Sequence, residues 1–255
     1  MMRNLLPEII ALPLLPVLIW QGRRTRARTP RLPEASGERN GVHPGTGEPL
    51  VLLAVGESPV AGVGVQVQEE AITAQLAVCL ANATGRAVHW NACGRNGATV
   101  RDALRELAEK VPAQPVDVLL LAFGVNDAVA FRPVRAWRRD VLALVAALRV
   151  RCGPKMVLLS GVPPMGKFPA LPQPLRWVLG LKAATLDRAL RQLAAEGAGL
   201  HVPLNLGQST DASLAAEDGY HPSAKGCLVW AALLADACRE MASASMDFVA
   251  TEERQ

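Results

Sequence analysis

Aromatic side chains are scarce in this 255-residue sequence: Phe, Trp and Tyr make up only 4% of it, although half of its residues are hydrophobic. Ala, Leu and Val supply most of that hydrophobic content. An antiparallel β-sandwich favours aromatic and β-branched residues, so this composition instead favours helices packed on a buried sheet. The length is sufficient for one domain with a sizeable core.

The sequence also lacks the cysteine patterns of disulfide scaffolds and metal sites. The cysteines are odd in number and widely spaced, and no CxxC pair or Cys/His cluster has metal-ligand spacing. They are Cys79, Cys93, Cys152, Cys227 and Cys238. We therefore predict buried free thiols in a reducing compartment.

Positive charge is not spread along the chain. The net charge is +4, and five arginines that fall within residues 23–31 account for it. They are Arg23, Arg24, Arg26, Arg28 and Arg31. A nucleic-acid binder is expected to carry basic residues over one face of its folded domain, so we expect no nucleic-acid partner.

No apolar run is long enough to span a bilayer. Residues 5–20 are apolar, but Pro7, Pro13 and Pro16 interrupt them, and a spanning helix needs about 20 apolar residues. No small-x-small cleavage site follows. Two interpretations stay open: peripheral membrane association, or a terminal segment that packs on the domain or is disordered. Arginines come next, and positive charge directly after an apolar segment tends to stay on the cytoplasmic side. We therefore expect a cytoplasmic protein. If the segment associates with the membrane, the rest of the chain lies at its inner face.

The remaining chain alternates apolar runs with amphipathic stretches. After a Pro/Gly-rich linker or extended arm over residues 28–48, we place one domain at 49–245 and a tail at 246–255, with residues 1–48 as the apolar segment and arm. The predicted strands are residues 50–55, 87–91, 117–123, 155–160 and 200–202. The predicted helices are residues 69–83, 100–110, 135–149, 175–196 and 224–241. This order predicts an α/β fold of three layers, α/β/α, with a central parallel sheet of about five strands.

Polar residues follow the ends of these strands, where open parallel sheets carry their reactive groups. Ser58 follows the first strand, in a turn whose glycines allow tight bending. Gly97 follows the second strand, ahead of Thr99, which is suited to cap the next helix. Asn126 and Asp127 follow the third strand. Taken singly, each segment is also explained by an ordinary turn or helix cap.

His221 differs from the other histidines of the chain. Asp218 stands three residues before it, so one loop can carry a base and the acid that orients it, with Gly219 permitting the bend. His43, His89 and His201 have no such neighbour, and we expect them to be structural or exposed.

Together the four segments resemble the sequence blocks of the SGNH (GDSL-type) hydrolases. Gly56-Glu57-Ser58 resembles the first block, Gly97 the second, Gly124-Val125-Asn126-Asp127 the third and Asp218-Gly219-Tyr220-His221-Pro222 the last. The resemblance covers roughly residues 51–241. Glu57 departs from the family's usual Gly-Asp-Ser, which puts the local loop geometry in question more than the chemistry.

This resemblance implies a flavodoxin-like SGNH hydrolase fold and a serine esterase. Ser58 is then the nucleophile, His221 the base and Asp218 its orienter. The backbone N–H groups of Ser58 and Gly97 and the side chain of Asn126 form the implied oxyanion hole. The implied partner is a small-molecule ester with a short- to medium-chain or lipid-derived acyl group. Neither a metal nor an organic cofactor is implied.

The loop over residues 162–175 is rich in proline and apolar residues, so we expect it to be extended. It is a candidate wall for an acyl pocket, with Met165, Phe168 and Leu171 as its lining. The alternative is a loop that packs sideways on the domain.

Two alternative functions stay open. The same residues serve an acyltransferase or a thioesterase equally well. From another class, a non-catalytic, membrane-associated binding module could retain the same fold, although it has no need of the Ser, Asn, Asp and His set.

Overall fold

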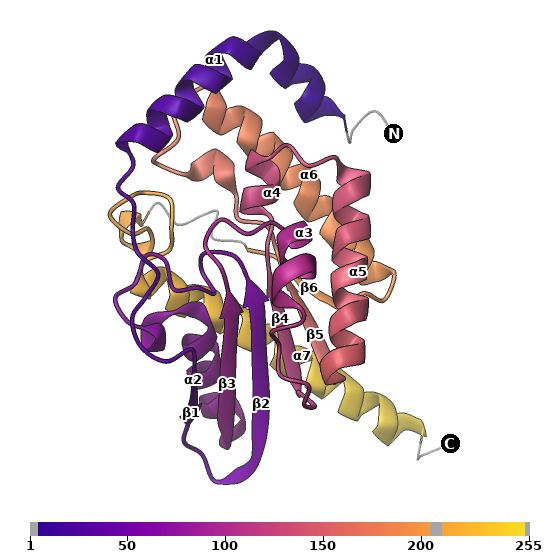
Figure 1. Cartoon of the computed structure of the whole chain (residues 1–255). Coiled ribbons are helices and arrows are strands. Elements are labelled where there is room, and N and C mark those ends of the chain that lie inside the picture. Colours follow the sequence, from indigo (N-terminus) through magenta and orange to yellow (C-terminus); the bar gives the residue numbers. More distant parts are fainter. Residues whose placement is uncertain (1–4, 205–210, 253–255) are drawn as a thin grey trace.

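The computed structural model describes residues 5–204 and 211–252, with side chains up to residue 241. Its centre is a six-stranded sheet in the order β1-β3-β2-β4-β5-β6 (Figure 1). The five predicted strands are all present, as β2 (Gly47–Gly56), β3 (Arg86–Gly94), β4 (Val118–Ala122), β5 (Met156–Ser160) and β6 (Leu200–Val202). These five pair in parallel, as the alternation of strands and helices predicts.

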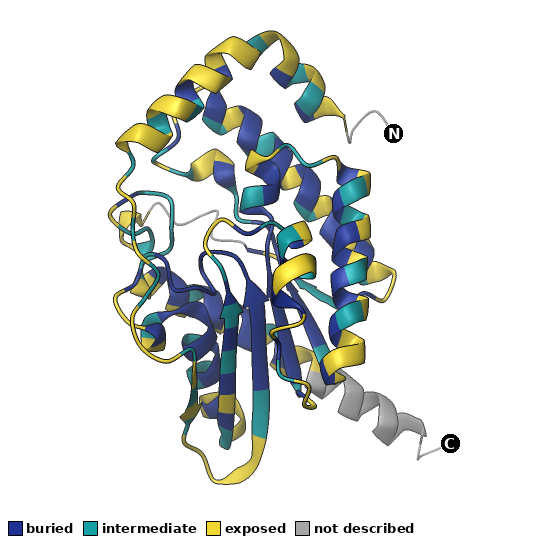
Figure 2. Cartoon of the chain, viewed as in Figure 1, coloured by how far each residue is buried: buried dark blue, intermediate teal, exposed yellow. Residues whose placement is uncertain are grey.

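The central part of the sheet is covered on both faces, which explains why the end of β2 and all of β4 are continuously apolar. Along β2, Leu52 and Ala54 point to one face, and Leu53 and Val55 point to the other. The first face packs on α2 (Ile72–Thr84) and α7 (Ala224–Glu252). The second packs on α3 (Val100–Asp102), α5 (Val134–Cys152) and α6 (Leu175–Ala195). Figure 2 shows the resulting core as a continuous buried band through the sheet and the inner sides of the helices.

The sixth strand was not predicted. β1 (Asn40–His43) lies within the stretch that we expected to be a linker or arm, and it pairs antiparallel with β3 at the edge of the sheet. Before β1 the chain does wrap the domain, since Ser36 exchanges backbone hydrogen bonds with Gln66 and Gln68 at 3.1 and 2.9 Å. Part of the expected arm is therefore an integral strand of the sheet.

The predicted helix over residues 100–110 is shorter and less regular than expected. Thr99 caps α3 in a capping box with Asp102, which confirms the predicted cap, but the next turn is a π-helix over Ala103–Leu107. A further short helix, α4 (Val125–Val129), starts directly after β4 and carries Asn126 and Asp127 in its first turn. All five cysteines are free, and three of them are buried.

The apolar N-terminal segment forms one helix, α1 (Leu6–Arg28), that packs along α6. Pro13 and Pro16 lie inside it, and the helix is bent in Figure 1, as expected where proline removes a backbone hydrogen bond. Glu8 forms an ion pair with Lys182 of α6, whose side chain is fully buried. In the described part of the chain, no helix has the length and apolarity that crossing a bilayer requires.

Candidate active site

Ser58 lies in the turn that follows β2, where the strand order reverses. β3 lies on one side of β2 and β4 on the other, so the turn is at the switch point of the sheet. The turn closes on itself through hydrogen bonds from Val60 and Ala61 to the Glu57 carbonyl and from Val63 to the Ser58 carbonyl. Ser58 is 7% exposed at this position.

Gly64 brings the Ser58 turn against the loop of His221. Its φ is +104°, and a Cβ added there would lie 2.3 Å from the Pro222 carbonyl oxygen and 3.0 Å from the His221 Cβ. Only glycine permits this approach. The turn that carries the first predicted block is therefore in direct contact with the last block, more than 150 residues away in the sequence.

Asp218 and His221 form a hydrogen-bonded pair, as their spacing predicts. The Asp218 Oδ2 lies 2.6 Å from the His221 Nδ1, and its Oδ1 accepts the backbone N–H groups of Tyr220 and His221 at 2.9 and 3.0 Å. Gly219, at φ 63°, allows the chain to curl around the carboxylate. Burial acts to raise the pKa of Asp218, but its hydrogen bonds from His221 and Tyr220 outweigh burial and hold that pKa below its ordinary value. Because a carboxylate only accepts hydrogen bonds, Nδ1 carries the proton and Nε2 is left as the acceptor.

Ser58 and His221 line the same pocket, whose volume is about 260 Å³. Its wall is mainly apolar and is supplied by four parts of the chain. They are the Ser58 turn, Val125 at the start of α4, the loop over residues 163–169, and residues 211–230, which include the start of α7. Lys167 and Asp211 add charge to this lining.

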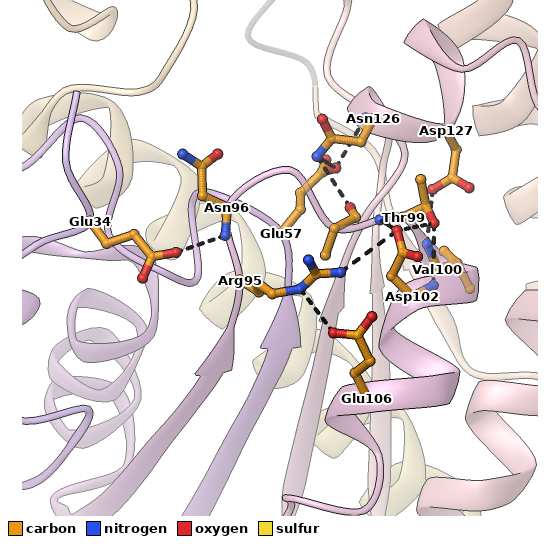
Figure 3. Close-up of polar contacts among 11 residues, drawn as sticks. Glu34, Glu57, Arg95, Asn96, Thr99, Val100, Asp102, Glu106, Asn126 and Asp127 are labelled. Atoms are coloured by element: carbon orange, nitrogen blue, oxygen red, sulfur yellow. Dashed lines mark hydrogen bonds and ion pairs between the residues drawn. The ribbon is translucent and has the colours of Figure 1, made fainter. Parts of the chain in front are cut away.

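The loop that carries Gly97 is held at both ends (Figure 3). On one side, Glu34 of the arm accepts the Asn96 backbone N–H at 2.8 Å. On the other, Asp127 accepts the Val100 backbone N–H at 3.1 Å, and the Asn126 side chain donates to the Ala98 carbonyl at 3.2 Å. Gly97 has φ +76°, which favours glycine, and the second and third predicted blocks are thereby joined.

Glu57, where the family pattern has aspartate, joins the first block to the third. Its carboxyl group accepts the backbone N–H groups of Val125 and Asn126 at 3.0 and 3.1 Å, and the Asn126 side-chain amide at 2.6 Å (Figure 3). Glu57 is 3% exposed, and burial raises its pKa to about 8 against the lowering effect of these hydrogen bonds. The longer side chain therefore holds the Ser58 turn to the start of α4.

The three predicted oxyanion donors differ in their availability. Within residues 5–204 and 211–252, the backbone N–H groups of Ser58 and Gly97 donate a hydrogen bond to no acceptor. The Asn126 amide, by contrast, already donates to Glu57 and to the Ala98 carbonyl. Asn126 does not line the pocket, so its amide would have to exchange a partner before donating to a ligand there.

The proposed acyl-pocket lining is correct for one residue of three. Phe168 lines the pocket, together with the prolines of its loop. Met165 and Leu171 are 0% and 4% exposed and belong to the hydrophobic core instead, so their assignment to the lining is wrong. The loop is also not extended throughout, because Met165–Lys167 forms a 3₁₀ turn that directs Met165 inward.

The lining also includes residues that were not predicted from the sequence, and two of them are large aromatic side chains. Tyr220 packs edge-on between Phe168 and His221, with ring-centroid distances of 5.1 and 5.3 Å. Trp230 of α7 donates to the Ser160 hydroxyl at 2.9 Å. Tyr220 lies within the recognised last block and could have been assigned from its position beside His221. Trp230 reaches the pocket only through the packing of α7, which no local pattern signals.

A second histidine–aspartate pair lies outside the pocket. His201, which we expected to be structural or exposed, has its Nε2 2.9 Å from the Asp187 Oδ1. The same oxygen accepts the Val162 backbone N–H at 3.1 Å. This pair anchors the start of the pocket loop, which supports the structural role. Among the described residues, no group of three or more His, Cys, Asp and Glu side chains is arranged to hold a metal ion.

Glu57→Gln should change how stability depends on pH. The pKa of Glu57 is about 8 in the folded state, and its ordinary value is 4.5. The contribution of Glu57 to the stability of the wild type is therefore complete below pH 4.5 and is lost as the pH rises through about 8. Glutamine does not titrate. Relative to the wild type, the variant should therefore gain stability between pH 5 and pH 9, by a few kcal/mol in the free energy of unfolding. Thermal unfolding of both proteins at pH 5, 7 and 9 measures this, and a constant difference at all three values would contradict the buried titration.

The comparisons with known proteins agree with this geometry. Residues 54–228 match the model of the GDSL-like Lipase/Acylhydrolase family. The chain is 28% identical to the GDSL-like esterase Rv1075c of Mycobacterium tuberculosis over 247 residues, which cover 89% of this chain and 77% of that protein.

Solved structures show the same fold. The lipase Lip_vut3 from a goat rumen metagenome superposes with a TM-score of 0.60 at 16% identity, covering 74% of this chain and 97% of the lipase. The psychrotrophic esterase EstA from Pseudoalteromonas sp. superposes with a TM-score of 0.55 at 20% identity, covering 76% and 98%. The predicted α/β fold class and the predicted family are thus confirmed. The chain belongs to the GDSL-like lipase/acylhydrolase family and is a serine hydrolase that acts on carboxylic esters.

Proposed function

We propose that the chain hydrolyses small carboxylic esters through an acyl-enzyme on Ser58, with His221 as the general base and Asp218 as its orienter. The observation that carries this proposal is that His221, whose Nδ1 lies 2.6 Å from the Asp218 Oδ2, lines the same pocket as Ser58. An oriented base beside a serine at a switch point is the arrangement that nucleophilic acyl transfer requires.

The proposed reaction has two steps, the acylation of Ser58 and the hydrolysis of the acyl-enzyme. His221 Nε2 takes the Ser58 proton as Oγ attacks the acyl carbonyl, and it returns the proton to the leaving alcohol. Water, deprotonated by the same nitrogen, then attacks the acyl-enzyme. As the bond between the acyl carbon and Oγ breaks, Nε2 returns that proton to Oγ, which releases the acid and restores Ser58 and neutral His221. Asp218 stabilises the imidazolium that forms in both steps.

The oxyanion would be bound by the Ser58 and Gly97 backbone N–H groups, both without an acceptor among the described residues. Asn126 is the proposed third donor. Its hydrogen bond to the Ala98 carbonyl is the longer of its two, at 3.2 Å, and is the one that we expect to be exchanged for the oxyanion. Catalytic hydrogen bonds often tighten only when substrate is bound.

The pocket favours a short- to medium-chain acyl group. Its volume of about 260 Å³ is small for a ligand site, and its lining is largely apolar. Phe168 is the bulky member of that lining within the proline-rich loop.

The proposal is tested with p-nitrophenyl esters of increasing acyl length, assayed with the purified chain. Turnover should be highest for short or medium acyl chains and should fall for long ones. Absence of hydrolysis at every chain length would contradict a general esterase.

Phe168→Ala should shift the preferred acyl length upward. Removing the ring enlarges the pocket, and each added methylene in an apolar pocket is worth about tenfold or more in specificity. We expect the ratio of kcat/KM for octanoyl over butyryl ester to rise roughly tenfold. Met165→Ala is the matched control, because it shortens a buried side chain of the same loop that does not line the pocket. That control should lower the melting temperature and leave the ratio unchanged, whereas an equal loss on all esters in Phe168→Ala would contradict the pocket assignment.

A further inference from the structure

One side of α1 is fixed to the domain by specific contacts. On this side of the helix, the side chains of Ala11, Leu18 and Gln21 are buried. Gln21 donates to the Gln173 carbonyl at 2.6 Å and accepts the Leu175 backbone N–H at 3.0 Å, at the point where the pocket loop ends and α6 begins. The helix is therefore a defined part of the fold, and its opposite side faces outward in a fixed orientation.

That opposite side is apolar and uncovered (Figure 2). Half of the large apolar side chains that are exposed in the described residues come from residues 5–20. They are Leu5, Leu6, Ile9, Leu12, Leu15, Val17, Ile19 and Trp20. The two most exposed are Leu12 at 73% and Ile9 at 61%. Scattered apolar residues need no explanation, but a continuous row of this length marks an interaction surface.

The charge on α1 is divided between its two sides. Its single acidic residue, Glu8, pairs with the buried Lys182 on the inner side. All five arginines of residues 23–31 are exposed, and the Arg24 guanidinium lies 5.1 Å from the ring centroid of Trp20. The outward side therefore has an apolar row with a tryptophan at its end, followed along the helix by uncompensated positive charge. Burial of apolar side chains and basic residues near the surface each favour binding to membranes that contain anionic lipids.

We propose that the outward side of α1, residues 5–28, binds the surface of a bilayer that contains anionic lipids. The apolar row enters the boundary between headgroups and acyl chains. The arginines contact the lipid phosphates, and no part of the helix spans the bilayer.

Such docking would place the active site beside the lipid. Figure 1 shows α1 beyond the carboxyl ends of the strands. The Ser58 turn, which lines the pocket, follows the carboxyl end of β2 and so lies at the same end of the sheet. Tyr220 of the pocket is partly buried, and its desolvation raises its pKa, while the positive charge of Arg26 acts to lower it. This inference rests on the proposed esterase function: an active site at this position would favour ester substrates that are drawn from the membrane.

The test is cosedimentation of the full chain with vesicles of phosphatidylcholine alone and of phosphatidylcholine with phosphatidylglycerol. The wild type should bind the anionic vesicles. The double variant Ile9→Glu/Leu12→Glu should bind them at least about tenfold more weakly. Arg23→Gln/Arg28→Gln, which leaves the apolar row intact, should weaken binding by about fivefold for each arginine and should reduce its dependence on salt.

Val150→Glu is the control, because it also replaces an exposed apolar side chain by glutamate, at a position that is 90% exposed on α5 and far from α1 in sequence. It should bind vesicles as the wild type does. All variants should keep the wild-type melting temperature and turn over a soluble ester normally, so that loss of vesicle binding is distinguished from failure of the proposed esterase.

Three results would overturn the proposal. They are no binding of the wild type to anionic vesicles, equal binding by the α1 variants, or a dimer that the α1 substitutions dissociate while vesicles are not bound. The last result would show that the apolar row is covered by a second copy of the chain.

Discussion

Ser58→Ala is expected to lower kcat for p-nitrophenyl butyrate by about 10⁴- to 10⁶-fold, because alanine has no oxygen to form the acyl-enzyme. The fold should survive the change. The Ser58 turn is held by backbone hydrogen bonds and by the Glu57 carboxyl group, neither of which involves the Ser58 hydroxyl. The melting temperature should therefore stay within about 2 °C of the wild type.

Ser36→Ala is the control for this measurement. It removes a hydroxyl that donates to the Gln66 carbonyl at 3.0 Å, on the exposed arm and away from the pocket. Its kcat should match the wild type. Near-wild-type hydrolysis by Ser58→Ala, measured at enzyme concentrations that exclude a contaminating esterase, would contradict the nucleophile assignment.

Asp218→Asn is expected to lower kcat by about 10⁴-fold. The asparagine Oδ1 can still accept the Tyr220 and His221 backbone N–H groups, so the loop should keep its shape. Its amide nitrogen, however, faces His221 Nδ1 as a donor and stabilises the tautomer that has its proton on Nε2. In that tautomer Nε2 cannot accept the Ser58 proton.

The same variant makes a pH prediction. Hydrogen bonding holds the pKa of Asp218 below 3.8, so its contribution to stability is present above pH 3.8 and is lost as the pH falls through the lower folded-state pKa. The difference in melting temperature between wild type and Asp218→Asn should therefore be largest near neutrality and should shrink in strong acid. Asp187→Asn, which alters the His201 pair outside the pocket, should change kcat by less than about tenfold. Equal loss in the two variants would contradict a specific role for Asp218.

The sheet was largely predictable because burial on both faces leaves a clear signal. The runs over residues 50–55 and 118–123 are continuously apolar, and both belong to central strands. β1 has no such signal: Asn40–His43 contains one large apolar side chain, Val42, which is exposed. Its strand conformation arises from backbone pairing with β3, which no local pattern reports.

α1 was not predictable as a helix for a related reason. Its prolines oppose helix formation, and what holds the segment is tertiary: the Glu8–Lys182 ion pair and the Gln21 hydrogen bonds at the start of α6. These partners lie more than 150 residues away in the sequence.

The site residues were predictable to the extent that topology brings strand ends together. Ser58 and His221 reach one pocket because the sheet order reverses at β2. The contact between Glu57 and Asn126 was not predicted. The two residues are 69 positions apart in the sequence, and whether their side chains meet depends on the exact positions of two loops above the sheet. Met165 and Leu171 were misassigned because an apolar loop residue can face the core or the pocket, and composition does not distinguish the two.

The most direct test of the account is covalent labelling of the nucleophile. The chain is incubated with a reactive aryl phosphonate ester, which is attacked as an ester carbonyl would be, and the modified peptide is identified by tandem mass spectrometry. The account predicts one phosphonyl group, attached to the Ser58 Oγ, and a label that forms far more slowly in Asp218→Asn. A label on any other residue that accompanies loss of esterase activity, or full activity after Ser58 is labelled, would contradict it.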